Sequence, residues 1–133
     1  MLLRWVTASA VLVSALVHLW LWWFDGFSSI DVIGPLFLLN AAAGTAIAAA
    51  TLLWRHWLPL LASVGFGAGT LGAFVVSATV GLFGIQERWT GAAVWIAAVS
   101  EAVAVLAGTL ALVREARGSR DTRLGVELEQ RTS

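Results

Sequence analysis

Two ionisable side chains, His18 and Glu101, lie inside long apolar stretches of the sequence. His18 belongs to VHLWLWWFDG, residues 17–26, where three tryptophans surround it, and Glu101 lies in the apolar run 91–113. Burying such groups in lipid costs free energy, so their presence predicts hydrogen-bonded partners or a functional site. The chemistry open to this pair is proton binding, ion pairing or the recognition of a polar ligand.

Other polar residues are expected to join this pair at a similar depth. Ser14 lies one helical turn from His18 on the same face, and we expect the inward side of His18 to meet Asn40, Ser77 or Glu101. The sequence therefore predicts an intramembrane polar cluster of Ser14, His18, Trp22, Asp25, Asn40, Ser77 and Glu101. Two interpretations stay open: a network that fixes helix register, or a ligand-binding cavity that opens outward.

Several chemistries are excluded or left without residues. The chain has no cysteine, so it can form neither a disulfide nor a cysteine-bound iron–sulfur cluster. His18 is expected in the outer third of the membrane and His56 at its inner interface, so the two histidines are too far apart to hold one haem. The remaining acids and histidines are too few for a zinc site, and no serine, histidine and acid are placed as a catalytic triad. No catalytic residue, cofactor or metal is predicted, and the sequence favours a role other than an enzyme.

The elements that must position these residues are four long apolar segments. The chain is 59% hydrophobic and 12% charged, and the segments span about 5–24, 35–54, 59–83 and 91–113. Each reaches the roughly 20 residues that a helix needs to cross a bilayer, and backbone groups in lipid must be satisfied within the segment. The sequence predicts an all-α integral membrane four-helix bundle over residues 1–113. Residues 114–133 are predicted to form a polar, disordered cytoplasmic tail.

The arginines predict the orientation of the bundle. Seven fall on one side of the predicted spans and one, Arg88, on the other; the seven are Arg4, Arg55, Arg114, Arg117, Arg120, Arg123 and Arg131. Positive charge stays on the cytoplasmic side, so both termini should be cytoplasmic. The expected location is the bacterial cytoplasmic membrane, with the lipid bilayer as first partner and no nucleic acid.

Glycines are expected to supply helix-packing faces. GAGTLG, residues 67–72, fits a dinucleotide-binding pattern, but it lies inside an apolar helix whose N–H groups are already used. Gly65, Gly69 and Gly72 instead form a small-residue ridge of the kind that lets helices approach closely. Gly44 and Gly108 offer similar surfaces. These faces are predicted to pack helices together and to bind a membrane-protein partner or a second copy.

The pattern HLWLW…DG…IGPLFLLNA…G, residues 18–44, resembles small four-helix bacterial membrane proteins of unassigned function and, loosely, the DoxX-like family. That resemblance implies a four-helix plan and an association with membrane redox complexes, such as a thiosulfate:quinone oxidoreductase. It carries over no functional residue. The function favoured by the sequence is an accessory or scaffold subunit. The alternative is a small-molecule-binding redox-complex subunit, or a small proton-coupled transporter, that uses the cluster around His18 and Glu101.

Overall fold

The computed structural model describes residues 1–84 and 86–132, which leaves Ile85 and Ser133 outside the description. The described chain is all-α. Its elements are α1 (Leu2–Phe24), the short 3-10 helix η1 (Phe27–Ser29), α2 (Ile33–Leu53), α3 (Trp57–Thr79) and α4 (Ala92–Thr132). Each of the four long helices is long and apolar enough to cross a membrane, which confirms the predicted fold class.

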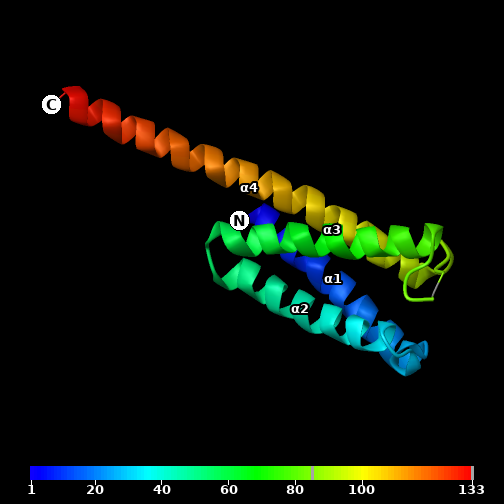
Figure 1. Cartoon of the computed structure of the whole chain (residues 1–133). Helices are drawn as coiled ribbons and strands as arrows, with labels where there is room; N and C mark the ends of the chain where they lie inside the picture. The colour runs from blue at the N-terminus through cyan, green and yellow to red at the C-terminus, as the bar shows by residue number, and fades with distance from the viewer. Residues whose placement is uncertain (85, 133) are drawn as a thin grey trace.

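The four helices form a bundle in which chain neighbours run in opposite directions (Figure 1). α1 packs against α2 and α4, and α3 packs against α4, whereas the contact between α2 and α3 is much smaller. We call the end that carries residues 25–32 and 80–91 the distal end. The opposite end, with Met1 and residues 54–56, is the proximal end. The weak α2–α3 contact leaves one side of the bundle less closed than the others.

Helix α3 ends at Thr79, earlier than the sequence predicted. Gly81, Phe83 and Gly84 all have positive φ, with a φ of 50° at Phe83. Left-handed backbone cannot continue a right-handed helix, and glycine adopts it without a steric penalty. The chain therefore leaves the helix and forms the distal connection to α4.

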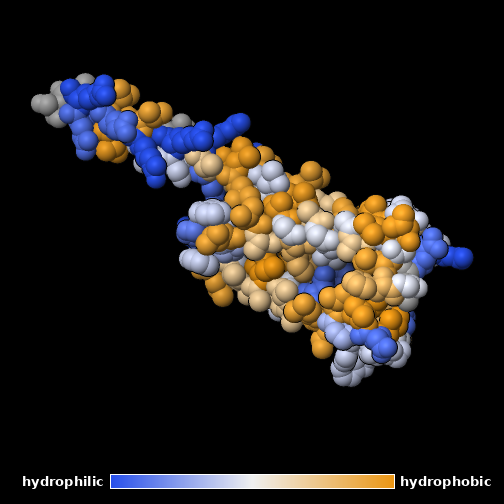
Figure 2. All heavy atoms as spheres, in the orientation of Figure 1, coloured by the Kyte–Doolittle hydropathy of each residue, from blue (hydrophilic) through white to orange (hydrophobic). Residues whose placement is uncertain are grey.

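The interior of the bundle is built from small and polar residues. On α1 the buried positions include Arg4, Thr7, Val11, Ser14 and His18, which recur every three or four residues and so form one helical stripe. Large apolar side chains point outward instead, and Figure 2 shows that they cover much of the visible surface of the bundle. This arrangement suits a bundle whose surroundings are lipid rather than water.

Glycines allow the closest helix approaches, but not at the positions of the predicted ridge. A Cβ built on Gly67 would lie 2.8 Å from the carbonyl oxygen of Glu101, so α3 touches α4 there. Gly44 is equally close to Ala15 and Phe66, and Gly108 to Val64. Gly44 and Gly108 are therefore used inside the bundle, and their assignment to partner faces was wrong.

The predicted ridge of Gly65, Gly69 and Gly72 is not used for packing inside this bundle. Apart from chain neighbours and the adjacent backbone of α3, no described atom lies within 4 Å of a Cβ built on any of the three, and all three are exposed. The ridge runs along a face of α3 that α4 does not cover. Whether a partner covers it stays a prediction.

Helix α4 continues well beyond the bundle, as far as Thr132 (Figure 1). The sequence predicted a polar, disordered cytoplasmic tail over residues 114–133, and the described part of that segment, 114–132, is helical in the structure. Residues 114–132 contain no proline, and their five arginines and three glutamates favour helix. The hydroxyls of Ser119 and Thr122 bond to carbonyls one turn earlier, at 3.0 Å each. This extension is polar and exposed, as the composition indicated.

Candidate functional site

The innermost polar contact joins α1 to α4. The Ser14 hydroxyl donates to Oε1 of Glu101 across 2.8 Å, and both residues are almost fully buried. Glu101 therefore faces the bundle interior, as its cost in lipid required. A carboxylate accepts further hydrogen bonds, so this contact does not exhaust its capacity.

His18 is tied to the same serine through the backbone. Its Nδ1 lies 2.9 Å from the carbonyl oxygen of Ser14. A carbonyl can only accept, so Nδ1 carries the proton, and in the neutral imidazole Nε2 is then an acceptor. The ring also meets Phe37 edge-on, with centroids 4.9 Å apart. His18 and Glu101 are thus linked through Ser14.

Asn40 brings α2 into the same region. Its Nδ2 donates to the Thr70 hydroxyl at 3.0 Å, and that hydroxyl donates onward to the Phe66 carbonyl at 2.8 Å. Oδ1 of Asn40 is buried and has no hydrogen-bond partner in the described part of the chain. A buried acceptor without a partner is uncommon and marks a place where a ligand or water can bind.

These polar groups border one cavity of about 850 Å³ in the distal half of the bundle. All four long helices contribute to its wall. Five of the seven residues predicted from the sequence line it: His18, Asp25, Asn40, Ser77 and Glu101. Ser14 bonds to Glu101 from behind, and Trp22 packs on Trp23 outside the lining. Five of the predicted residues thus share one cavity and Ser14 bonds to one of them, whereas Trp22 does not join them; the role of these residues in binding stays a prediction.

Most of the remaining cavity wall is apolar and aromatic. Phe37, Phe66 and Phe74 belong to the lining, and Thr70, which sequence reasoning missed, lies among them. Thr70 gave little signal, because a single threonine in an apolar helix is common. Hydrophobic rings around a few converging polar groups are typical of a small-molecule site.

The cavity reaches the bundle surface between α2 and α3. Leu36, Leu39 and Ala73 line it and are also exposed on these two helices. Figure 2 shows hydrophilic atoms recessed between α2 and α3, with hydrophobic atoms on either side of them. Since α2 and α3 are the weakest neighbouring pair, the opening follows from the way the bundle is packed.

Charged residues surround the distal mouth of the cavity. Asp25 ends α1, where its backbone N–H bonds to the Leu21 carbonyl, and Glu87 and Arg88 belong to the connection between α3 and α4. Burial raises the pKa of Glu87, and a backbone hydrogen bond from Arg88 opposes that rise. The mouth therefore combines charged groups with the apolar wall beneath it.

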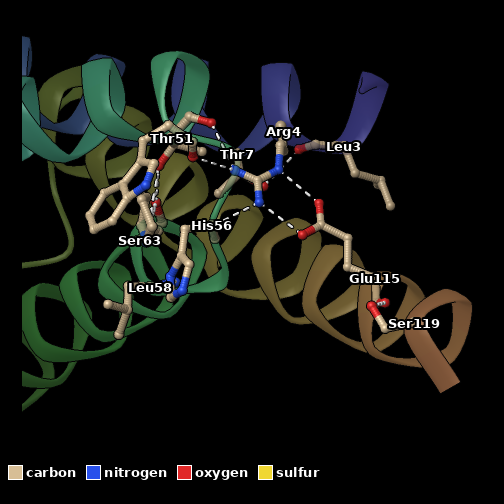
Figure 3. A network of polar contacts seen from close by, with 11 residues as sticks. Leu3, Arg4, Thr7, Thr51, His56, Leu58, Ser63, Glu115 and Ser119 are labelled. Atoms are coloured by element: carbon tan, nitrogen blue, oxygen red, sulfur yellow. Dashed lines mark hydrogen bonds and ion pairs between the residues drawn. The ribbon is translucent and has the colours of Figure 1, made fainter. Parts of the chain in front are cut away.

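A second polar centre at the proximal end was not predicted from the sequence. Figure 3 shows Arg4 of α1 between α4 and the end of α2. Its guanidinium makes two bonds to the Glu115 carboxylate, of 2.7 and 2.8 Å. Three further bonds reach the carbonyls of Thr51, Trp54 and His56, at 3.1, 3.1 and 2.8 Å. All five donors of the guanidinium are therefore used.

This proximal network also covers both ends of the turn between α2 and α3. Arg4 binds carbonyls at the C-terminal end of α2, where a cation is favoured by the helix dipole. The His56 side chain caps the first turn of α3 by accepting from the Leu58 N–H at 3.2 Å. Since all five donors of Arg4 and both carboxylate oxygens of Glu115 have protein partners, we assign this centre a structural role.

Metal binding gains no support from the described residues, because among them no group of three or more histidine, aspartate or glutamate side chains could hold an ion. Four packed membrane-spanning helices make the chain a small polytopic membrane protein. Comparison with protein families, with curated proteins and with solved structures found no significant match. The four-helix plan thus stands on the structure, and the DoxX-like resemblance finds no support in these comparisons.

Proposed function

We propose that this protein binds a small, lipid-soluble molecule in the distal cavity. The observation that carries the proposal is the cavity of about 850 Å³, into which α1, α2 and α4 bring His18, Asn40 and Glu101. Binding pockets for small molecules commonly have volumes of roughly 300–1,000 Å³ and combine apolar walls with few polar groups. In the sequence analysis, ligand binding was the alternative to the favoured role of an accessory or scaffold subunit. A redox-complex subunit and a small transporter both fall within this class.

The opening between α2 and α3 supports a ligand that reaches the cavity from the bilayer. Leu36 and Leu39 form its α2 side and are themselves exposed. An apolar rim does not repel the hydrocarbon part of a lipid-soluble molecule. A water-soluble ligand, by contrast, would have to lose its hydration at this rim.

The test compares two variants of α3. Ala73→Phe places a ring in the cavity wall, whereas Ala68→Phe places the same ring at an exposed position of α3 outside the cavity. Wild type and both variants would be purified in one mild detergent, extracted with solvent and analysed by mass spectrometry. A small molecule should accompany wild type and Ala68→Phe at similar amounts and fall several-fold in Ala73→Phe. Equal extracts from all three proteins would refute the proposal.

An accessory or scaffold role remains as a second candidate, on a separate observation. Gly65, Gly69 and Gly72 expose a ridge that no other described helix covers, and Gly69 also borders the cavity. Close approach of another transmembrane helix along such a ridge is a common mode of association. The variant pair Gly65→Leu and Gly72→Leu should then release a partner, or a second copy, that co-purifies with wild type. Unchanged co-purification would exclude this use of the ridge.

A further inference from the structure

We propose that the ligand of the distal cavity is a lipid-soluble amine, with an ammonium head that carries N–H groups and an apolar body. This inference rests on the proposed function and adds the chemical class of the ligand. It follows from three features of the cavity: the hydrogen-bonding character of its floor, its charge, and the nature of its wall. We use "floor" for His18, Asn40 and Glu101.

The floor offers acceptors rather than donors. Nδ1–H of His18 is used on the Ser14 carbonyl, and Nδ2 of Asn40 donates to Thr70. Oδ1 of Asn40 has no partner among the described residues. The contacts of His18 and Glu101 given above use Nδ1 and Oε1, so Nε2 of His18 and the second carboxylate oxygen of Glu101 are the atoms to which a ligand could donate. In the neutral imidazole Nε2 accepts, and a carboxylate only accepts. A head group that donates several hydrogen bonds complements this floor, and a head group that only accepts does not.

The charges of the lining favour a cation. Three acidic side chains line the cavity, at Asp25, Glu87 and Glu101, against one guanidinium, at Arg88, and a bound cation favours the ionised form of an acid beside it. Glu101 is the deepest of these groups and has no basic residue bonded to it; its hydrogen bond comes from the Ser14 hydroxyl. An ammonium group beside it would form a charge-assisted hydrogen bond in surroundings of low polarity, where such bonds are strong.

The wall suits the rest of such a molecule. The rings of Phe37, Phe66 and Phe74 line the cavity close to the polar floor. Aromatic faces attract cations, and they also pack against hydrocarbon. The exposed side chains of Leu36 and Leu39 continue the apolar lining to the opening between α2 and α3. A cationic head at Glu101 with an apolar body along this path fits the cavity from end to end.

The experiment uses four probes that share one apolar body and differ in the head group: 4-phenylbutylamine, its N,N,N-trimethyl derivative, 4-phenylbutanol and 4-phenylbutyrate. The full chain in lipid nanodiscs would be equilibrated by dialysis at pH 7 against each probe. Empty nanodiscs of the same lipid give the uptake into the bilayer alone. Saturable uptake should be tightest for the primary amine, weaker for the trimethyl cation, which has no N–H, and absent for the carboxylate.

Two variants of α4 locate the head group. Glu101→Gln keeps an acceptor for the Ser14 hydroxyl but removes the charge, so amine affinity should fall by roughly tenfold or more, the scale expected when a buried charge pair loses one partner. Ser100→Ala is the matched control, because its hydroxyl bonds to the Ala97 carbonyl and does not line the cavity. It should bind the amine as wild type does.

The outcomes separate this inference from the proposed function. If the alcohol or the carboxylate binds as tightly as the amine and Ala73→Phe blocks it, the cavity binds ligands but the amine assignment is wrong. If none of the four probes binds saturably, the amine assignment is also refuted. The proposed function is refuted only by the extraction experiment, if wild type, Ala73→Phe and Ala68→Phe yield the same amounts of small molecule. The head-group order in wild-type protein decides the matter even if Glu101→Gln fails to fold.

Discussion

Replacement of Arg4 by methionine tests whether the proximal network holds the bundle together. Methionine keeps an unbranched apolar stem of similar reach but supplies no donor. The change removes five hydrogen bonds at once: two to Glu115 and one each to the carbonyls of Thr51, Trp54 and His56. It therefore separates α1 from both the end of α2 and the middle of α4.

The magnitude follows from which partners can be rehydrated. The bond to Thr51 is buried, and a buried carbonyl left without a donor costs about 1–3 kcal/mol. The bonds to Trp54 and His56 are only partly buried, so water can replace them. The Glu115 side chain is 44% exposed, and for a screened pair of this kind we assign about 1 kcal/mol. Arg4→Met should therefore lower the free energy of unfolding by roughly 2–4 kcal/mol, and Glu115→Gln by about 1 kcal/mol.

The assay is unfolding by SDS titration in mixed micelles, followed by circular dichroism. Arg114→Met is the control, because Arg114 is exposed and lies next to Glu115 in the sequence. Its substitution removes the same charge as Arg4→Met and leaves the hydrogen bonds of Arg4 in place. That variant should change stability by less than about 0.5 kcal/mol. The double variant of Arg4 and Glu115 should cost less than the sum of the two single changes. Equal losses for Arg4→Met and Arg114→Met, or strict additivity, would refute this account.

Three further predictions concern other parts of the fold. Gly67→Ala should destabilise the bundle by about 1–3 kcal/mol, because its Cβ would meet the backbone of α4. Gly65→Ala adds its Cβ in open space, so it should be neutral or stabilise the bundle by up to about 1 kcal/mol. Thermal unfolding in one detergent compares the two variants, and equal effects would contradict the assigned helix faces. Glu87→Gln should stabilise the fold at pH 8 and not at pH 4. The raised pKa of Glu87 means that its ionised form is disfavoured in the folded state, so this cost appears as the pH rises above the pKa that Glu87 has in the unfolded chain. Thermal scans at both pH values test this, and a stabilisation at pH 4 that is absent at pH 8 would contradict it. A reporter fused at Ser29 should lie outside and one fused after the C-terminus inside, as the arginine distribution predicts; the opposite pair would reverse the topology.

The parts of the structure that sequence could predict are those fixed by the cost of polarity in lipid. Four apolar runs could only be helices, and the third ended four residues earlier than predicted, before glycine and phenylalanine residues with left-handed backbone. The cost of polar groups in lipid predicted that His18, Asn40 and Glu101 turn inward at a similar depth, and the packing of the helices then brings all three to one cavity. Whether that cavity binds a ligand is a separate question that burial does not answer.

The parts that escaped prediction depend on helix rotation and on distant pairings. Gly65 and Gly67 are two residues apart on α3, yet only Gly67 faces α4. The spacing of the glycines alone does not predict how α3 is rotated about its axis. Arg4 and Glu115 are 111 residues apart, and the positive-inside rule already accounted for Arg4 without a partner. Glu115 itself belonged to a segment whose mixed charge suggested disorder rather than helix.

The opening between α2 and α3 has a thermodynamic consequence. An apolar slot that faces the bilayer exchanges its contents with acyl chains, so a ligand that enters must displace hydrocarbon rather than water. Lipid tails are as apolar as leucine, so the hydrophobic gain from this exchange is close to zero. For the proposed ligand, affinity must then come mainly from the polar atoms of the floor and from the attraction of the aromatic wall for a cation. A detergent tail would compete for the same slot in a purified sample. If the cavity binds the ligand proposed above, its occupancy will follow the ligand's mole fraction in the membrane, so the bilayer must first concentrate a compound that is dilute in water.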